Sequence, residues 1–182
     1  MPTCLKRYHH TGQSHFVTFC YYRYPLFTND ASRQVFESAL ERVRRSFRMR
    51  IYGYVVMPEH IHLLVSEPER DTLADALKSL KQGVSRRLIG DADHFWQKRY
   101  YDFNVRNHEQ FLKKLHYIHW NPVRAGLCER PEDWPWSSFL PHATGVEERI
   151  EIESEWTARK RERAAGKLCA AVELPHSSQN QA

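Results

Sequence analysis

Four residues have side chains that could together do chemistry on a phosphate. They are two histidines in one short segment and, about two helices later in the chain, a tyrosine and an asparagine. His60 and His62 flank Ile61 within a run of β-forming residues. Because successive side chains of a strand point to opposite faces, both imidazoles are expected on one face, where they make half of a metal site. A pair of half-exposed strand histidines without a ligand is the simpler alternative.

Tyr117 and Asn121 lie four residues apart in a predicted helix and therefore share one of its faces. If that helix packs beside the histidine strand, the amide oxygen of Asn121 becomes the third metal ligand, and the metal polarises a phosphate as a Lewis acid. Tyr117 is then the nucleophile that forms a phosphotyrosine, whose ester conserves the bond energy for rejoining another DNA end. Free tyrosine has a pKa of ~10, so this role requires a nearby cation or base.

The ligand types favour a transition ion, since imidazole nitrogens suit Mn²⁺ while Mg²⁺ prefers oxygen. Zn²⁺ and Ni²⁺ are expected to bind tightly without supporting the reaction. A purely structural zinc site is the alternative, and it requires a fourth protein ligand. His116 and His119 are the nominees, but both lie off the helix face of Tyr117, which favours packing or surface roles for them.

The elements that must position these residues follow from hydrophobic periodicity and from helix start and stop signals. Strands are predicted at 14–22, 51–57, 60–66 and 95–105, and helices at 30–47, 73–88 and 109–120. Asn29 or Asp30 is the expected cap of the first helix and Asp71 that of the second, while Pro122 places Asn121 at the end of the third. This order predicts an α+β, ferredoxin-like antiparallel sheet with helices packed on one face.

The composition is that of one folded domain with a polyanionic partner. The chain has 182 residues, 41% of them hydrophobic, and a formal net charge of +5. Its four cysteines include no C-x-x-C pair, which argues against a disulfide framework or a thiolate zinc site and fits the reduced cytoplasm. No signal peptide or membrane span is expected. The predicted domain covers residues 1–146, and 147–182 is a charged tail, partly helical or disordered.

One segment and one scattered set of cations are candidates for contact with nucleic acid. Residues 95–105 interleave aromatic rings with cations, which suits base stacking and phosphate contact in single strands. Packing of Phe95, Trp96 and Tyr101 in the core explains the same pattern equally well. The candidate phosphate contacts are Lys98, Arg99, Arg106 and Arg124. The alternative for each of them is a surface charge without a role in binding.

Residues 57–65 (MPEHIHLLV) together with 117–127 (YIHWNPVRAGL) resemble the HUH-type single-tyrosine transposases, in particular the REP-associated tyrosine transposases. The likeness extends to 16–27 (FVTFCYYRYPLF), 96–102 (WQKRYYD) and 134–138 (WPWSS), and so spans most of residues 14–139. Glu59 is the one departure within the histidine motif, since Asn is common there in the family. Glu59 has two interpretations: it is a turn residue, or its carboxylate is a hydrogen-bond partner for a ligand imidazole.

The resemblance implies a ferredoxin-like fold and Mg²⁺- or Mn²⁺-dependent cleavage of single-stranded DNA that carries palindromic REP hairpins. It implies a 5′-phosphotyrosine at Tyr117, a free 3′-hydroxyl, and metal held by His60 and His62. A monomer in the cytoplasm, associated with the nucleoid, is the corresponding expectation. Two alternatives remain open: a protein of the same fold that binds DNA hairpins without cleaving them, and one that binds RNA hairpins.

Overall fold

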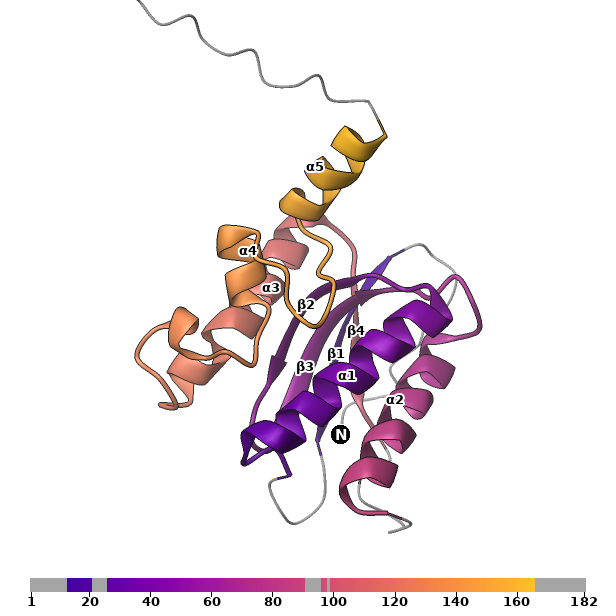
Figure 1. Cartoon of the computed structure of the whole chain (residues 1–182), viewed down its shortest axis with the longest axis vertical. Helices are drawn as coiled ribbons and strands as arrows, with labels where there is room; N and C mark the ends of the chain where they lie inside the picture. Colours follow the sequence, from indigo (N-terminus) through magenta and orange to yellow (C-terminus); the bar gives the residue numbers. More distant parts are fainter. Residues whose placement is uncertain (1–12, 21–25, 91–95, 98, 166–182) are drawn as a thin grey trace, which may run out of the picture.

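The computed structural model describes residues 13–20, 26–90, 96–97 and 99–165. Four antiparallel strands form one sheet in the order β2-β3-β1-β4 (Figure 1). The strands are β1 (Ser14–Cys20), β2 (Ile51–Val56), β3 (His60–Ser66) and β4 (Tyr101–Val105). With β1 and β3 central and two helices in the crossovers, this is the ferredoxin-like arrangement, and the expected fold class is confirmed.

Two helices cover one face of the sheet. They are α1 (Asp30–Phe47) and α2 (Leu73–Leu88), which lie side by side (Figure 1). The alternating residues Val17 and Phe19 of β1 point into the core beneath them. The other large buried side chains of this core come from both helices and from β2 and β3: Phe36, Leu40, Leu77, Leu80, Tyr54, Ile61 and Leu63.

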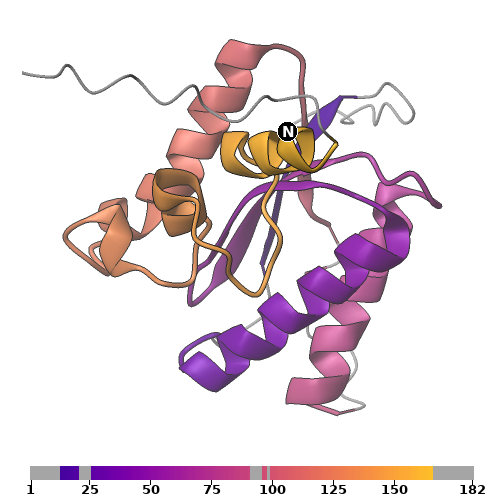
Figure 2. The same cartoon turned by 45° about the horizontal axis from the view of Figure 1, so that its top comes forward.

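The third helix, α3 (His108–Arg124), lies on the opposite face of the sheet (Figure 2). The expectation of helices on one face therefore holds for α1 and α2, and α3 adds a second layer. Beneath α3 a smaller apolar cluster is formed by Phe16, Val55, Met57, Leu64, Val105 and Ile118. The central strands β1 and β3 consequently have apolar residues on both faces, so polar residues on the α3 face are exceptions to the pattern.

Helix ends differ from the sequence predictions in two places. Asn29 caps α1 as expected, since its side chain accepts a hydrogen bond from the Ser32 N–H. The prediction of Asp71 for α2 is wrong because Thr72 is the N-cap, in a reciprocal capping box with Asp75. Asp71 instead has a left-handed backbone, with φ of 62°.

The predicted end of the third helix at Asn121 is also wrong, because α3 continues through Pro122 to Arg124. Proline removes only its own N–H from the ladder, and later donors restore the pattern. The Ala125 N–H bonds the Asn121 carbonyl at 3.0 Å, and the Leu127 N–H bonds the Pro122 carbonyl at 2.9 Å. Asn121 therefore stands inside a regular helix, which fixes its direction more tightly than a helix end would.

The predicted strand at 95–105 is regular only over β4, from Tyr101 to Val105. Trp96 packs in the core, with its ring centroid 5.3 Å from that of Phe19 and its Nε1–H donating to Ser85 Oγ at 2.8 Å. The core alternative is thus confirmed for Trp96. It is wrong for Tyr101, which is 45% exposed, and Phe95 lies outside the described residues.

Part of the charged C-terminal segment packs on the body of the protein. Ile150 and Ile152 are buried in the main core, and the Glu153 N–H donates to the Ile51 carbonyl at 2.8 Å. Helix α5 (Glu155–Ala164) follows and buries no side chain. A domain boundary at residue 146 stays a prediction. Among the described helices, none is long and apolar enough to cross a membrane.

A buried ionisable cluster at one end of the sheet joins β1, β4 and Glu67, the residue that follows β3. His15 Nδ1 lies 2.9 Å from Asp102 Oδ1, and His15 Nε2 lies 3.5 Å from Glu67 Oε1. Burial lowers the pKa of His15, but hydrogen bonds and charge from Asp102 and Glu67 outweigh it, so the pKa is raised above 6.5. Protonated His15 therefore stabilises the folded state.

This cluster predicts a pH-dependent stability that His15→Gln removes. Because the folded-state pKa is raised, the contribution of His15 is fully present below 6.5 and is lost as pH rises through the folded pKa. The free energy of unfolding of the natural protein minus that of His15→Gln should therefore fall as the pH rises above about 6.5. Urea unfolding followed by circular dichroism measures it. A difference that stays level, or grows, over this range contradicts the assignment.

Candidate active site

The two histidines of β3 lie on the sheet face that α3 covers. Their ring centroids are 4.6 Å apart with the ring planes at 70°. Ile61 between them points the other way, into the core under α1 and α2. His62 is buried and His60 is half-buried, so both imidazoles lie at the base of the site, where surrounding groups fix their orientation.

Two neighbours fix the tautomer of His62. Strand pairing sets Thr18 of β1 opposite His62, with Thr18 Oγ1 2.7 Å from His62 Nδ1. On the other side of the ring, Asn121 Nδ2 lies 3.3 Å from His62 Nε2. Since Nε2 accepts from the amide, Nδ1 carries the proton and donates it to the threonine hydroxyl. The lone pair of Nε2 therefore points toward α3, and this orientation is typical of a metal-ligating histidine.

Burial keeps both imidazoles neutral. It lowers the pKa of His62 to about 3, with further contributions from the charges of His60 and Lys114. Burial also lowers the pKa of His60, against a hydrogen bond with Asn121 and the nearby charge of Glu59. Asn121 thus contacts both histidines, and at neutral pH each ring offers a lone pair.

Tyr117 lies over this pair on α3. Its ring centroid is 5.2 Å from that of His62 and 5.9 Å from that of Phe16, and the side chain is 36% exposed. Arg124, two turns further along the helix, holds its guanidinium carbon 5.5 Å from the centre of the Tyr117 ring. The site therefore combines neutral nitrogen donors, an amide, an accessible phenol and a cation.

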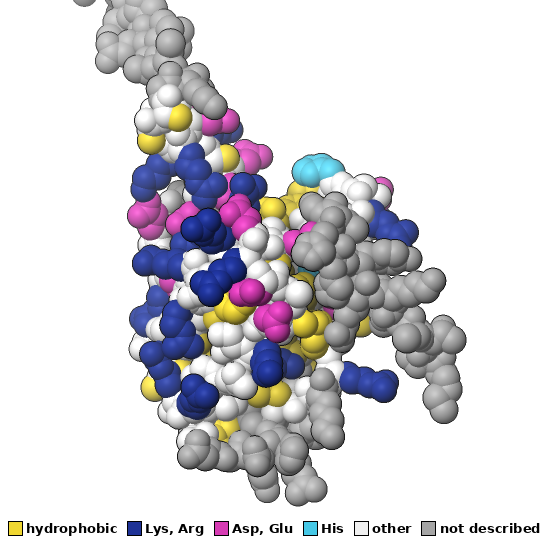
Figure 3. Space-filling model, turned by 90° about the vertical axis from the view of Figure 1, so that its right-hand side faces the viewer, with side chains coloured by type: hydrophobic (Ala, Val, Ile, Leu, Met, Phe, Trp, Pro, Cys, Tyr) yellow, Lys and Arg dark blue, Asp and Glu magenta, His cyan; other side chains and the backbone are white. Residues whose placement is uncertain are grey.

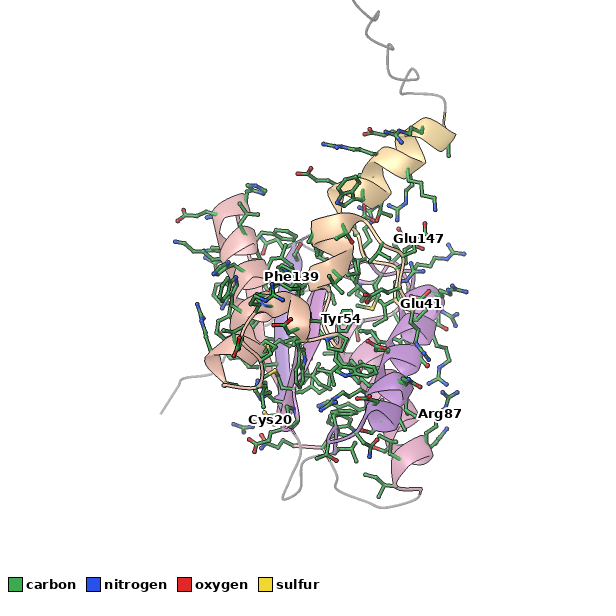
Figure 4. All side chains as sticks on the ribbon, turned by 60° about the vertical axis from the view of Figure 1, so that its left-hand side comes forward. Cys20, Glu41, Tyr54, Arg87, Phe139 and Glu147 are labelled. Carbon is green, nitrogen blue, oxygen red and sulfur yellow. The ribbon has the colours of Figure 1, made fainter. Side chains whose placement is uncertain are left out.

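The position of α3 depends on a polar contact beneath it. His119 Nε2 lies 2.9 Å from Ser138 Oγ, and the same oxygen accepts the Tyr54 N–H at 3.0 Å. Ser138 precedes α4 (Phe139–Thr144), and the sticks labelled Phe139 and Tyr54 mark either side of this junction in Figure 4. The aromatic segment around Trp134 and Ser138 thus joins β2 to α3, since the Val56 N–H also bonds the Trp136 carbonyl at 2.9 Å.

Neither histidine nominated as the fourth ligand of a structural zinc site lies beside His60 and His62. His119 is buried on another side of α3, and burial together with the charges of His142 and His116 lowers its pKa to about 3. His116 rests against Trp120, with ring centroids 5.6 Å apart. Over the described part of the chain, no three His, Cys, Asp or Glu side chains form a group that fits a metal. A donor set of two histidines and an asparagine is what remains.

The candidate phosphate contacts are spread widely. Arg124 belongs to the site through its contact with Tyr117, whereas Arg99 and Arg106 are exposed near the two ends of β4 and contact none of the four site residues. Lys98 lies outside the described residues. Figure 3 shows further Lys and Arg side chains on the side that carries α1 and α2, which is remote from the histidines.

Sequence reasoning missed three residues of the site: Thr18, Phe16 and Lys114. Only the register of β1 against β3 reveals that Thr18 faces His62 and that the Phe16 ring stacks on His62 at 5.4 Å. Lys114 precedes Tyr117 by one helical turn, so helical spacing alone was a sufficient signal for it.

Comparison with known proteins agrees with this geometry. A sequence model of the family described as Transposase IS200 like matches residues 8–121. A REP-associated tyrosine transposase of Haemophilus influenzae is 31% identical over 117 residues, which cover 57% of this chain and 66% of the relative. One of Escherichia coli K12 is 30% identical over 108 residues, covering 58% and 64%. The chain thus matches slightly less than two thirds of each relative's length.

Similarity in three dimensions is broader. The solved structure of a REP-associated tyrosine transposase bound to a REP hairpin matches with a TM-score of 0.69 and 25% sequence identity. The match covers 84% of this chain and 92% of that one. It therefore extends over most of the chain.

Removing the Ser138 hydroxyl tests how α3 is held. Ser138→Ala leaves the buried Tyr54 N–H and His119 ring without their partner, so the free energy of unfolding should fall by about 1–3 kcal/mol. Ser46→Ala, at an exposed position of α1, is the control and should change it by less than about 0.5 kcal/mol. Chemical denaturation of both variants measures the effect, and equal stabilities would show that Ser138 does not hold the helix.

Proposed function

Since the chain belongs to the family of IS200-like transposases, we propose that it is a metal-dependent endonuclease and transesterase for single-stranded DNA. It cleaves and rejoins DNA beside REP-type hairpins through a 5′-phosphotyrosine intermediate. The observation that carries the proposal is the meeting of α3 with β3. Tyr117 and Asn121, one turn apart, come within 5.2 Å (ring centroids) and 3.3 Å (Nδ2 to Nε2) of the same imidazole, that of His62.

The choice of substrate is supported by the relatives and by the charge of the chain. Both relatives are named REP-associated tyrosine transposases, and the similar solved structure holds a REP hairpin. A net charge of +5 favours a polyanionic substrate of this kind. One copy of the chain supplies both histidines, the asparagine and the tyrosine, which supports a monomer as the active form.

The donor set fits a divalent cation. His60, His62 and Asn121 would hold it, because both imidazoles are neutral and the His62 Nε2 lone pair faces Asn121. A turn of the Asn121 amide about its Cβ–Cγ bond exchanges nitrogen for oxygen at that point, which supplies the third ligand. When bound there, Mg²⁺ or Mn²⁺ supplies Lewis-acid polarisation of the scissile phosphate.

The protein's own residues perform the remaining steps. The phenol oxygen of Tyr117 attacks the phosphorus, its proton passes to water, and the bond from phosphorus to the 3′ oxygen breaks. The leaving oxygen takes a proton to give a free 3′-hydroxyl, while the 5′ phosphate stays on Tyr117. The guanidinium of Arg124 over the ring stabilises the negative charge that develops on the phenol oxygen. Attack by another 3′-hydroxyl reverses the step and rejoins DNA.

Replacement of the nucleophile tests the mechanism. With a labelled single-stranded hairpin and Mn²⁺, the natural protein should form a covalent protein–DNA adduct that EDTA abolishes. Tyr117→Phe, which removes one oxygen, should form none. Tyr52→Phe is the control and should form the adduct normally, because its ring packs on Phe111 away from the histidines. Denaturing gel electrophoresis measures the adduct. Tight hairpin binding without any adduct would favour the non-cleaving alternative.

The contact between Thr18 and His62 predicts an effect on metal affinity. Thr18→Val keeps the shape but removes the acceptor of the His62 Nδ1–H, so Mn²⁺ should bind at least about tenfold more weakly. Thr144→Val, whose hydroxyl bonds the Leu140 carbonyl on α4, is the matched control. Isothermal titration of each variant with Mn²⁺ gives the affinities. Equal values for the Thr18 variant and the natural protein would rule out this orienting role.

A further inference from the structure

A single aromatic ring connects the candidate site to the open edge of the sheet. The Phe16 ring is surrounded by the imidazole of His62 and the rings of Tyr117 and Tyr101, with centroid distances of 5.4, 5.9 and 6.4 Å. The Nζ atom of Lys114 lies 4.4 Å from the centroid of the same ring. Tyr101 and Lys114 therefore lie within reach of the reacting groups, although neither belongs to them.

Tyr101 is placed for stacking. Strand register puts Tyr101 opposite Thr18, and Thr18 opposite His62, so the three stand in one row across β4, β1 and β3 on the α3 face. With neighbouring strands ~4.8 Å apart, Tyr101 lies roughly 10 Å from His62 along this row. β4 is an edge strand, and the ring is 45% exposed, whereas α3 covers the face over β2 and β3.

Lys114 is placed for a phosphate. Its ammonium is held over the Phe16 ring and lies 4.8 Å from the centroid of the Phe103 ring. Within the described chain no carboxylate pairs with it, while its neighbour Lys113 pairs with Glu109. Partial burial lowers the pKa of Lys114, which reflects the desolvation of this unpaired cation. An anion brought beside it would restore the interactions that burial removes.

We propose that Tyr101 and Lys114 form a subsite for the single-stranded nucleotide next to the scissile phosphate, whose base stacks on Tyr101 and whose phosphate pairs with Lys114. The inference rests on the proposed function and specifies which part of the DNA the site holds. The pairing of an exposed ring with a cation around one aromatic platform matches the chemistry of single-stranded nucleic acid. Paired bases of a hairpin stem hide their faces in the stack, so the stem is not the occupant.

The test compares two DNA ligands by fluorescence anisotropy: a hairpin with single-stranded flanks at both ends, and the same hairpin without flanks. Tyr101→Ala should bind the flanked hairpin about tenfold more weakly, or about 1.4 kcal/mol, and Tyr101→Phe should bind it normally. Lys114→Gln should also weaken this binding and reduce the slope of log affinity against log salt by ~0.7. Affinity for the unflanked hairpin should stay within about twofold in every variant.

Matched controls come from the same helix. Trp120→Ala removes a ring that is 38% exposed and rests on His116, and Lys113→Gln removes the neighbouring cation; both should bind flanked DNA normally. The subsite is overturned if Tyr101→Ala and Lys114→Gln bind flanked DNA as tightly as the natural protein does. It is also overturned if these two variants lose equal affinity for the unflanked hairpin. Binding is read separately from cleavage, so a protein that binds as expected but forms no adduct refutes the proposed function and supports the subsite.

Discussion

The site depends on the packing of α3 across the open face of the sheet. Asn121 and Tyr117 approach His62 because α3 is held on the sheet: Ile118 between them is buried against the strands, and His119 bonds Ser138 beneath the helix. Gly53 permits this approach, since a Cβ at that position would stand 2.6 Å from Leu115 Cδ1. A helix that shifted along the sheet by one turn, about 5.4 Å, would separate the amide from the imidazole.

The two faces of the sheet have different roles. One face carries the large core with α1 and α2, and its apolar contacts provide the bulk of the burial that stabilises the fold. The other face carries a small apolar cluster together with the polar and aromatic side chains of the site. Because side chains alternate along β3, Ile61 packs in the core while His60 and His62 point into the site. One strand therefore supplies residues for stability and residues for the site at different positions.

The sequence predicted the order of elements and the shared face of His60 and His62, because strand period and helix caps are local signals. It did not predict α3 on the second face or the continuation of α3 past Pro122, because tertiary contacts and later hydrogen bonds decide both. Thr18 was out of reach for the same reason: its contact with His62 joins residues 44 positions apart and follows from register alone. The metal and DNA roles of the site residues stay predictions.

Pulsed electron paramagnetic resonance of the protein titrated with Mn²⁺ tests the central claim most directly, because it detects nitrogen atoms bound to the metal. A site built between β3 and α3 predicts couplings to two imidazole nitrogens, one of which disappears in His60→Ala and another in His62→Ala. The spectrum of His116→Ala should keep both couplings, since that exposed imidazole rests on Trp120. Mn²⁺ that shows no nitrogen coupling, or couplings that survive both strand substitutions, would contradict the account.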